Sequence, residues 1–175
     1  MTFTLPDIDT IRTTGFRPTA VACFVHDRKV LLVFHEAYRL WQLPQGGVDN
    51  GELPRATIVR ESAEELGETF AESIPEEKEL TFVGRDRVEF LPSKYNVRDL
   101  KLDSGEPVLM KGKEYLFFAV PVESSEIKLA ESEFSQYEWH SYESAQERIE
   151  EIYQPGKQRI TRRAVQFLRD EKIID

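Results

Sequence analysis

The fold of this chain is decided by residues 45–67, which read QGGVDNGELPRATIVRESAEELG. The first part contains three glycines and predicts a loop without regular structure. The second part, residues 53–66, predicts an α-helix, with Pro54 suited to its first turn and Gly67 to its end. Apolar residues recur three or four positions apart in this helix. The face that we expect to be buried consists of Ala56, Val59, Ala63 and Leu66.

A second face of the predicted helix carries three carboxylates. Glu61, Glu64 and Glu65 stand at positions i, i+3 and i+4, so they project from one side. A solvated helix face would tolerate them, but these three follow a glycine-rich loop that lets a ligand approach the backbone. Hard divalent cations such as Mg²⁺ prefer oxygen ligands, so we expect a metal site rather than a solvated face.

The arrangement resembles the Nudix box, G-x5-E-x7-R-E-U-x-E-E-x-G-U, in which U is a bulky apolar residue. Every glycine and charged position of that motif is filled in this chain. Two U positions differ, because Ser62 and Glu68 occupy them, and we expect a less apolar packing seam there. The matching residues are Gly46, Glu52, Arg60, Glu61, Glu64, Glu65 and Gly67.

The likeness extends from Arg17 to about Leu168. Arg17-Pro18, residues 41–47 (WQLPQGG) and residues 133–139 (EFSQYEW) resemble the Nudix branch that contains bacterial RNA pyrophosphohydrolases and dinucleoside polyphosphate hydrolases. The resemblance implies a Nudix-like α/β/α sandwich with a mixed β-sheet. It also implies hydrolysis of a nucleoside diphosphate linked to another group, in which water attacks phosphorus while divalent cations neutralise charge on the oxygens.

Roles for the box residues follow from the same resemblance. Mg²⁺, or Mn²⁺, would be held by Glu61, Glu64, Glu65 and the backbone carbonyl of Gly46. Glu61 is alternatively the base for the attacking water. We expect Arg60 to pair with Glu52 and so to fix the loop against the helix, while Gly67 is structural.

Outside the box, the resemblance points to one further acid and three substrate-binding residues. Glu133 matches an additional acidic residue of the branch, which completes a metal site or acts as general base; the neighbouring Glu131 is the alternative. Lys157 matches a lysine near the substrate phosphates. RNA pyrophosphohydrolases commonly place a base-stacking aromatic residue before that lysine, where this chain has Gly156. The substrate-binding candidates are Lys157, Phe90 and Arg17, with a core role as the alternative for Phe90.

Around the box, the pattern predicts one mixed α/β domain over residues 17–175, preceded by an N-terminal extension, residues 1–16, that lies on the domain or frays from it. Residues 92–112 predict a long loop, which in a compact domain is often functional. A docking helix is expected from about residue 158 to 173. Strands are expected at residues 20–25, 30–34, 39–44, 80–91, 115–122 and 137–142.

Composition narrows the function further. The 175 residues carry a formal net charge of −9, which argues against a non-specific nucleic-acid or DNA binder. Between residues 52 and 79 there are nine acidic and three basic residues, so much of this charge surrounds the predicted metal helix. The single Cys23 excludes an internal disulfide, and no segment has the length and apolarity of a membrane span. We therefore expect a cytoplasmic protein with no membrane partner.

These observations favour a Mg²⁺-dependent nucleotide pyrophosphohydrolase whose substrate is a dinucleoside polyphosphate or a related small nucleotide. Removal of pyrophosphate from an RNA 5′ end is the alternative reaction, although Gly156 speaks against it. A nucleotide-binding regulatory module without catalysis is the alternative of another class. Such modules typically lose box carboxylates, whereas Glu61, Glu64 and Glu65 are all present here.

Overall fold

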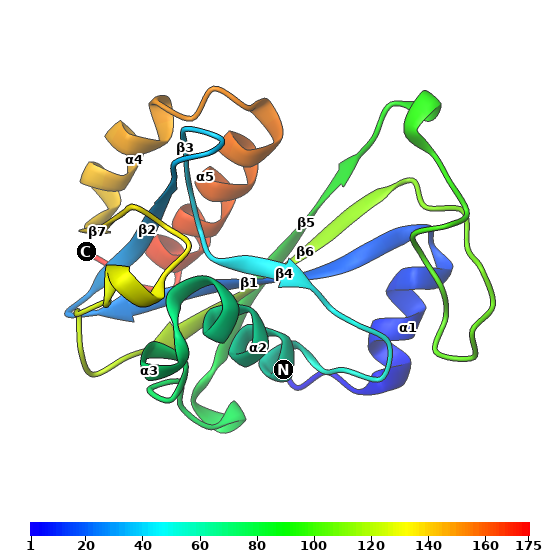
Figure 1. The fold of residues 1–175 in the computed structure, drawn as a ribbon, viewed down its shortest axis with the longest axis horizontal. Helices are drawn as coiled ribbons and strands as arrows, with labels where there is room; N and C mark the ends of the chain where they lie inside the picture. Colours follow the sequence, from blue (N-terminus) through cyan, green and yellow to red (C-terminus); the bar gives the residue numbers. More distant parts are fainter.

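The computed structural model of the protein describes residues 1–175 and contains a seven-stranded mixed sheet with helices on both faces (Figure 1). Three short 3₁₀ helices cover Glu77–Glu79, Pro92–Lys94 and Leu129–Glu131. The helices are α1 (Leu5–Thr13), α2 (Pro54–Leu66), α3 (Glu68–Ala71), α4 (Tyr142–Glu150) and α5 (Pro155–Asp170). The strands are β1 (Phe16–His26), β2 (Lys29–His35), β3 (Leu40–Gln42), β4 (Gln45–Gly47), β5 (Thr81–Glu89), β6 (Gly112–Pro121) and β7 (Gln136–His140).

Strands β1 and β6 form the parallel centre of the sheet, and the other pairings are antiparallel. The main strand order is β3-β2-β1-β6-β5, with β4 paired to β1 and β7 paired to β2. β1 and β6 are buried along most of their length because helices cover both faces of the sheet. In the parallel pair, Arg17 stands beside Lys113, which brings two basic residues together at one end of the sheet.

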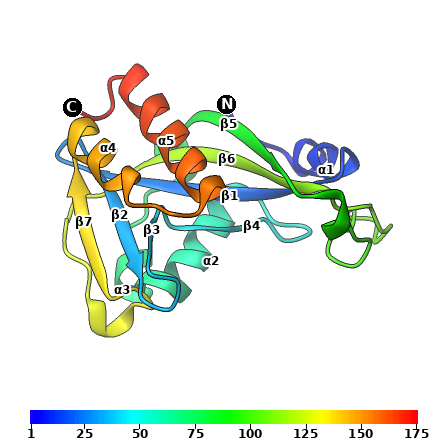
Figure 2. The ribbon, with the colours of Figure 1, turned by 90° about the horizontal axis from the view of Figure 1, so that it is seen from above.

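Two hydrophobic cores lie on opposite faces of the sheet. One contains Ile8 of α1, Ile58 of α2 and Phe70 of α3, and the other contains Ile149 of α4 and Ile160 of α5. Figure 2 shows α4 and α5 on one side of the strands and α2 with α3 on the other. The predicted α/β/α sandwich is therefore confirmed.

Helix α2 has nearly the predicted bounds, and Gly67 ends it with a φ of +101° that favours glycine. The face predicted to be buried is partly right, because Leu66 is only 1% exposed and Val59 packs against the core. Ala56 is exposed, and the residues that enter the core are Pro54, Thr57, Ile58, Ser62 and Leu66. The helix is rotated in this way because Glu61 and Glu65 must face β4, so the small Ser62 comes to lie against the sheet. The predicted less apolar seam is thus found at Ser62, which is only 1% exposed.

The glycine-rich segment was predicted to be a loop without regular structure, but its first part forms the strand β4. β4 pairs antiparallel with β1, with Ala20 beside Gly46 and Thr19 beside Gly47. Glycine lacks a side chain but keeps both backbone hydrogen-bonding groups, so it can extend a ladder where a ligand or another side chain must come close. Helix α4 was not predicted, since only Ala145 and Ile149 of its nine residues are buried.

The N-terminal extension lies on the domain and does not fray. The side chains of Thr4 and Asp7 form a capping box at the start of α1. Ile8 is fully buried and Ile11 is 6% exposed, both in the core beneath α2. The Thr-x-x-Asp spacing was the available sequence signal for this helix.

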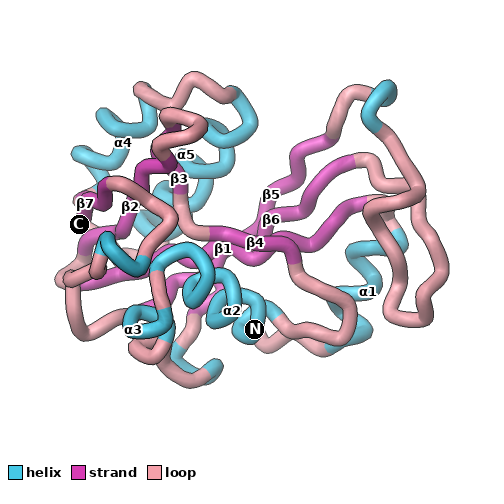
Figure 3. The backbone as a smooth tube through the Cα atoms, in the orientation of Figure 1, coloured by secondary structure: helices cyan, strands magenta, loops and turns pink.

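The predicted long loop corresponds to residues 90–111, here called the arm, which project beyond the ends of β5 and β6 (Figure 3). The arm is folded back on itself by isolated bridges between Asn96 and Met110 and between Lys101 and Pro107. Leu100 and Met110 of the arm are buried, although they belong to neither of the two cores. No helix of the structure combines the length and the apolar character that a membrane crossing requires.

Candidate active site

Gly46 brings β4 into contact with α2. A Cβ atom added to Gly46 would lie 2.1 Å from the Cδ atom of Glu61, so only glycine leaves room for this carboxylate. Gly47 likewise leaves room for Arg17, because an added Cβ would lie 2.4 Å from the Nη2 atom of its guanidinium. The two glycines therefore receive an acidic and a basic side chain at adjacent positions of one strand.

Arg60 joins the loop to the helix, as predicted. Its Nε donates to Oε1 of Glu52 at 3.0 Å, and its Nη2 donates to Oε2 of Glu52 at 2.9 Å. Nη2 also donates to the carbonyl of Gly47 at 3.0 Å, and Nη1 to Oε1 of Glu61 at 2.5 Å. Burial by itself would raise the pKa of Glu52, but hydrogen bonds from Arg60 and Thr57 hold that pKa below its usual range. The bidentate pair fixes the loop in place.

Among the carboxyl groups of the box, Glu65 has the most strongly shifted pKa. Burial, followed by the charges of Glu61 and Glu133, raises its pKa to about 8. Its Oε2 atom is buried and has no hydrogen-bond partner in the protein. A buried carboxylate oxygen without a donor is costly unless a cation binds it, so Glu65 fits a metal ligand.

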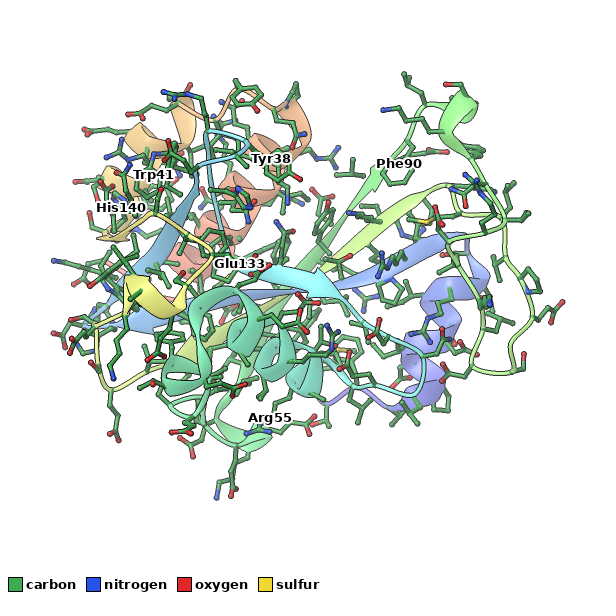
Figure 4. The ribbon with its side chains drawn as sticks, viewed as in Figure 1. Tyr38, Trp41, Arg55, Phe90, Glu133 and His140 are labelled. Carbon is green, nitrogen blue, oxygen red and sulfur yellow. The ribbon has the colours of Figure 1, made fainter.

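Glu133, and not Glu131, stands beside this carboxyl group. The backbone N–H of Glu133 donates to the carbonyl of Glu65 at 2.9 Å, and its charge contributes to the raised pKa of Glu65. Glu131 instead contacts Gly67, where an added Cβ would lie 2.7 Å from its own Cβ. Figure 4 shows Glu133 close to α2, on the segment that precedes β7.

The oxygen donors suit a hard cation, but they are not arranged as a closed cage. No three of these carboxylates converge as a ready ligand group, since Glu61 is bonded to Arg60 and Glu64 is exposed. Glu61, Glu64 and Glu65 nevertheless share one side of α2, with Glu133 next to Glu65. The unpartnered oxygen of Glu65 and the space at Gly46 make this side of the helix fit Mg²⁺.

A basic group faces the acidic one. Lys157, near the start of α5, lies close enough to Glu65 for their charges to interact. Burial and, to a smaller extent, the charge of the nearby Lys113 lower the pKa of Lys157 to about 8, while Glu65 opposes the shift. Lys113 is in turn the cross-strand neighbour of Arg17. The structure thus brings the predicted Lys157 and Arg17 together through Lys113.

Sequence reasoning missed Lys113. The available signal was its position at the start of β6, at the end of a strand next to the one that carries Arg17. Phe90 lies at the outer end of β5 (Figure 4), two residues beyond Val88, whose Cγ1 would lie 3.9 Å from a Cβ on Gly156. Phe90 directly follows Glu89, the last residue of β5. It is half-buried and belongs to neither core.

A family model described as the NUDIX domain matches residues 16–163 of the chain. The chain belongs to the Nudix family. This Nudix protein is 30% identical to Nudix hydrolase 25 of Arabidopsis thaliana, over 89% of the chain and 90% of that protein. It is 27% identical to the RNA pyrophosphohydrolase of Acinetobacter baylyi, over 75% of the chain and 77% of that protein. The chain is therefore an enzyme, a pyrophosphohydrolase of the Nudix type.

Solved structures agree on the fold of this Nudix domain. The dihydroneopterin triphosphate pyrophosphohydrolase of E. coli matches with a TM-score of 0.58 and 16% identity, over 89% of the chain and 98% of that structure. A C. elegans Ap4A hydrolase in a binary complex matches with a TM-score of 0.50 and 16% identity, over 87% and 98%. At such identities the likeness shows the fold alone.

Proposed function

We propose that this Nudix enzyme hydrolyses a pyrophosphate linkage in a nucleoside polyphosphate with Mg²⁺, or Mn²⁺, held on the carboxylate side of α2. The first substrate class is a dinucleoside polyphosphate or a related small nucleotide. One observation carries the proposal: an acidic group and a basic group meet where Glu65 faces Lys157. A polyphosphate needs both, because cations must neutralise the acids before its own charges can approach.

The two groups have different tasks. Glu61, Glu64 and Glu65, with the carbonyl of Gly46, would hold the metal, which supplies charge neutralisation at the phosphate oxygens when bound. Lys157, Lys113 and Arg17 bind and orient the non-bridging oxygens of the substrate by charge-assisted hydrogen bonds. Arg60 positions Glu61 and the loop through its hydrogen bonds to Glu61 and Glu52.

Glu61 and Glu133 are the two carboxylates placed to accept a proton from the attacking water. Oε1 of Glu61 already accepts a short hydrogen bond from Arg60. The side chain of Glu133 accepts no hydrogen bond and is exposed. Glu133 is therefore the freer proton acceptor of the two. Its replacement by Gln should lower kcat, because an amide cannot accept the proton of the attacking water.

The RNA 5′ end is the second candidate substrate, because several relatives, including the one from Acinetobacter baylyi, are RNA pyrophosphohydrolases. Two features disfavour it here. Gly156 offers no aromatic ring before Lys157. The basic charge of α5 is also partly neutralised, since Arg159 pairs with Asp86 at 2.8 Å and Arg162 pairs with Glu150 at 2.6 Å.

A screen of purified protein by mass spectrometry tests the proposal. The substrates are a dinucleoside tetraphosphate, nucleoside triphosphates, ADP-ribose and triphosphorylated RNA, each with Mg²⁺ or Mn²⁺. We expect turnover of the dinucleoside tetraphosphate, with Glu65→Gln as the inactive control. Turnover of ADP-ribose alone would contradict the substrate class. Calorimetric nucleotide binding without any product would instead favour the non-catalytic module.

A further inference from the structure

Five basic side chains follow one another from the active site into the arm, and we call them the basic track. Within this track, Lys157 and Lys113 influence each other's charge, and Lys113 stands beside Arg17. None of the five forms an ion pair with a carboxylate, whereas many other arginines do, for example Arg28, Arg148 and Arg159. The members are Lys157, Lys113, Arg17, Arg98 and Lys101.

The outer end of the basic track is a pocket between the arm, α1 and the loop of residues 48–53 that joins β4 to α2, here called the box loop. Its volume is about 280 Å³, enough for a phosphate group with part of its sugar. Arg17, Arg98 and Lys101 line it, together with the buried Val48 and Leu100. Arg17 belongs both to this pocket and to the active site, because its guanidinium lies over Gly47.

The floor of the pocket is held in place before any ligand binds. Arg12, only 2% exposed, donates to the carbonyls of Val48 and Asp49 at 3.0 Å each. It also donates to Oδ1 of Asp103 at 2.8 Å, and that carboxylate accepts from the side-chain amide of Asn50 at 2.9 Å. These bonds tie α1, the box loop and the arm into one unit. A rigid polar floor lowers the conformational cost of binding.

Two acids also line the pocket, and they do not cancel its positive charge. Asp49 lies 3.4 Å from Nη2 of Arg60, so its charge is offset from the side of the box. Asp99 is exposed and uses its backbone N–H to bond with Asn96. The three unpaired bases, Arg17, Arg98 and Lys101, therefore outnumber the one unpaired acid, and the pocket favours an anion.

We propose that this pocket is a second phosphate-binding subsite, which holds a phosphate group of the substrate away from the linkage that is cleaved. The proposal rests on the proposed function, since it extends the same substrate from Lys157 along the basic track. It requires a substrate with phosphate groups beyond those at the metal. Such groups belong either to a long polyphosphate chain or to the second nucleotide of an RNA 5′ end.

The test compares long and short substrates in the full-length protein. The variant Arg98→Gln/Lys101→Gln removes two charges from the pocket. We expect the ratio of kcat/KM for a dinucleoside tetraphosphate to that for a nucleoside triphosphate to fall about tenfold, because charge-assisted hydrogen bonds to phosphate are lost. The change should lie in KM for the long substrate. A triphosphorylated RNA dinucleotide forms the second arm of the comparison.

The matched control is Lys94→Gln/Lys128→Gln, which removes two charges from exposed lysines that do not line the pocket. The control should leave the substrate ratio within twofold of the wild type. A loss with the dinucleoside tetraphosphate alone identifies the polyphosphate chain as the ligand, and a loss with the RNA dinucleotide alone identifies the second nucleotide. Equal ratios in the pocket variant and the control for both substrates would overturn the subsite.

A binding measurement separates this subsite from the proposed function. Calorimetry with inorganic tripolyphosphate, without added metal, reports on the basic track and not on hydrolysis. We expect the pocket variant to bind about tenfold more weakly than the wild type and the control. If the wild type hydrolyses none of the substrates but this difference is found, the proposed function fails while the anion site stands. If all three proteins bind alike, the subsite is wrong.

Discussion

The Nudix box, residues 46–68, and the arm, residues 90–111, meet at the box loop. The box is held together by contacts between residues close in the sequence, and the arm by contacts between residues far apart in it. In the box, Arg60 reaches Gly47, Glu52 and Glu61, which lie within 13 positions of it in the sequence. In the arm, Asp103 is bonded to Arg12, which lies 91 positions away. Residues of a catalytic motif that contact one another locally stand at a fixed spacing in the sequence. Residues such as Arg12 and Asp103, which make contact only after distant segments have packed, have no fixed spacing. The box therefore carries the chemistry, and the arm with α1 carries its support.

The largest expected effect comes from the box. Glu65→Gln removes the buried carboxylate whose Oε2 has no partner in the protein. We expect kcat to fall on the order of 10²–10⁴-fold, as for loss of a group that acts in the reaction. The free energy of unfolding should not fall, since a neutral amide relieves the repulsion from Glu61 and Glu133. Steady-state kinetics and urea denaturation measure the two quantities. Glu68→Gln, an exposed acid next to Gly67, is the control and should be fully active.

The second-largest effect is expected at Arg12, which joins α1 to the box loop and the arm. Arg12→Met keeps much of the buried volume but removes the donors to Val48, Asp49 and Asp103. We expect a loss of about 2–4 kcal/mol in the free energy of unfolding, because buried acceptors are left without partners. Urea denaturation at constant m-value measures it. A stable variant with wild-type unfolding would show that α1 does not brace the box loop.

A smaller effect is expected at the partner of Arg12. Asp103→Asn keeps one acceptor oxygen but removes the charge that Arg12, Asn50 and the N–H of Gly51 contact. Because Asp103 is partly exposed, we expect a loss of only about 1 kcal/mol. Glu106→Gln, an exposed arm residue whose side chain makes no hydrogen bond, is the control. In the double variant with Arg12→Met the two losses should not add, since both remove one network.

The smallest effect is the pH dependence of the difference in stability between the wild type and Asp103→Asn. Hydrogen bonding from Asn50, then from the N–H of Gly51 and from Arg12, lowers the pKa of Asp103 below its ordinary value of 3.8. The folded chain thus releases this proton more readily than the unfolded chain, and the stabilisation is present above that value. It should disappear as the pH falls through the folded-state pKa. Wild type and Asp103→Asn should therefore become closer in stability below about pH 4. A gap that widens on acidification would contradict the assignment.

The box helix shows how far sequence reasoning reaches. Pro54 and Gly67 were predicted from the positions that such residues take at helix ends, and the Arg60–Glu52 pair was predicted from the resemblance to the Nudix box. The buried face of the same helix was wrong at Ala56, because apolar periodicity does not show how a helix is rotated against a sheet. Here the need to place Glu61 against Gly46 decided the rotation, and Ser62 was buried as a consequence.

The basic side of the site shows the opposite case. Lys157 and Arg17 were found by resemblance, but Lys113 was not, because it adjoins Arg17 only through the parallel register of β1 and β6. The C-terminal helix carries several arginines close together in the sequence, yet Asp86 from β5 and Glu150 from α4 pair with Arg159 and Arg162. Charges that form one run in the chain have different partners in the fold.

The sequence by itself determined the family, the carboxylate side of the helix and the glycine that ends it, since these depend on residue type at short, fixed spacing. Only the tertiary structure decided which oxygen of Glu65 lacks a partner, that Glu133 and not Glu131 stands beside it, and that α1 and the arm brace the box loop. The physical reason is the distance along the chain over which each interaction acts. Helix periodicity and capping act within a few residues, whereas burial, unpaired charge and long-range hydrogen bonds exist only once distant segments have packed.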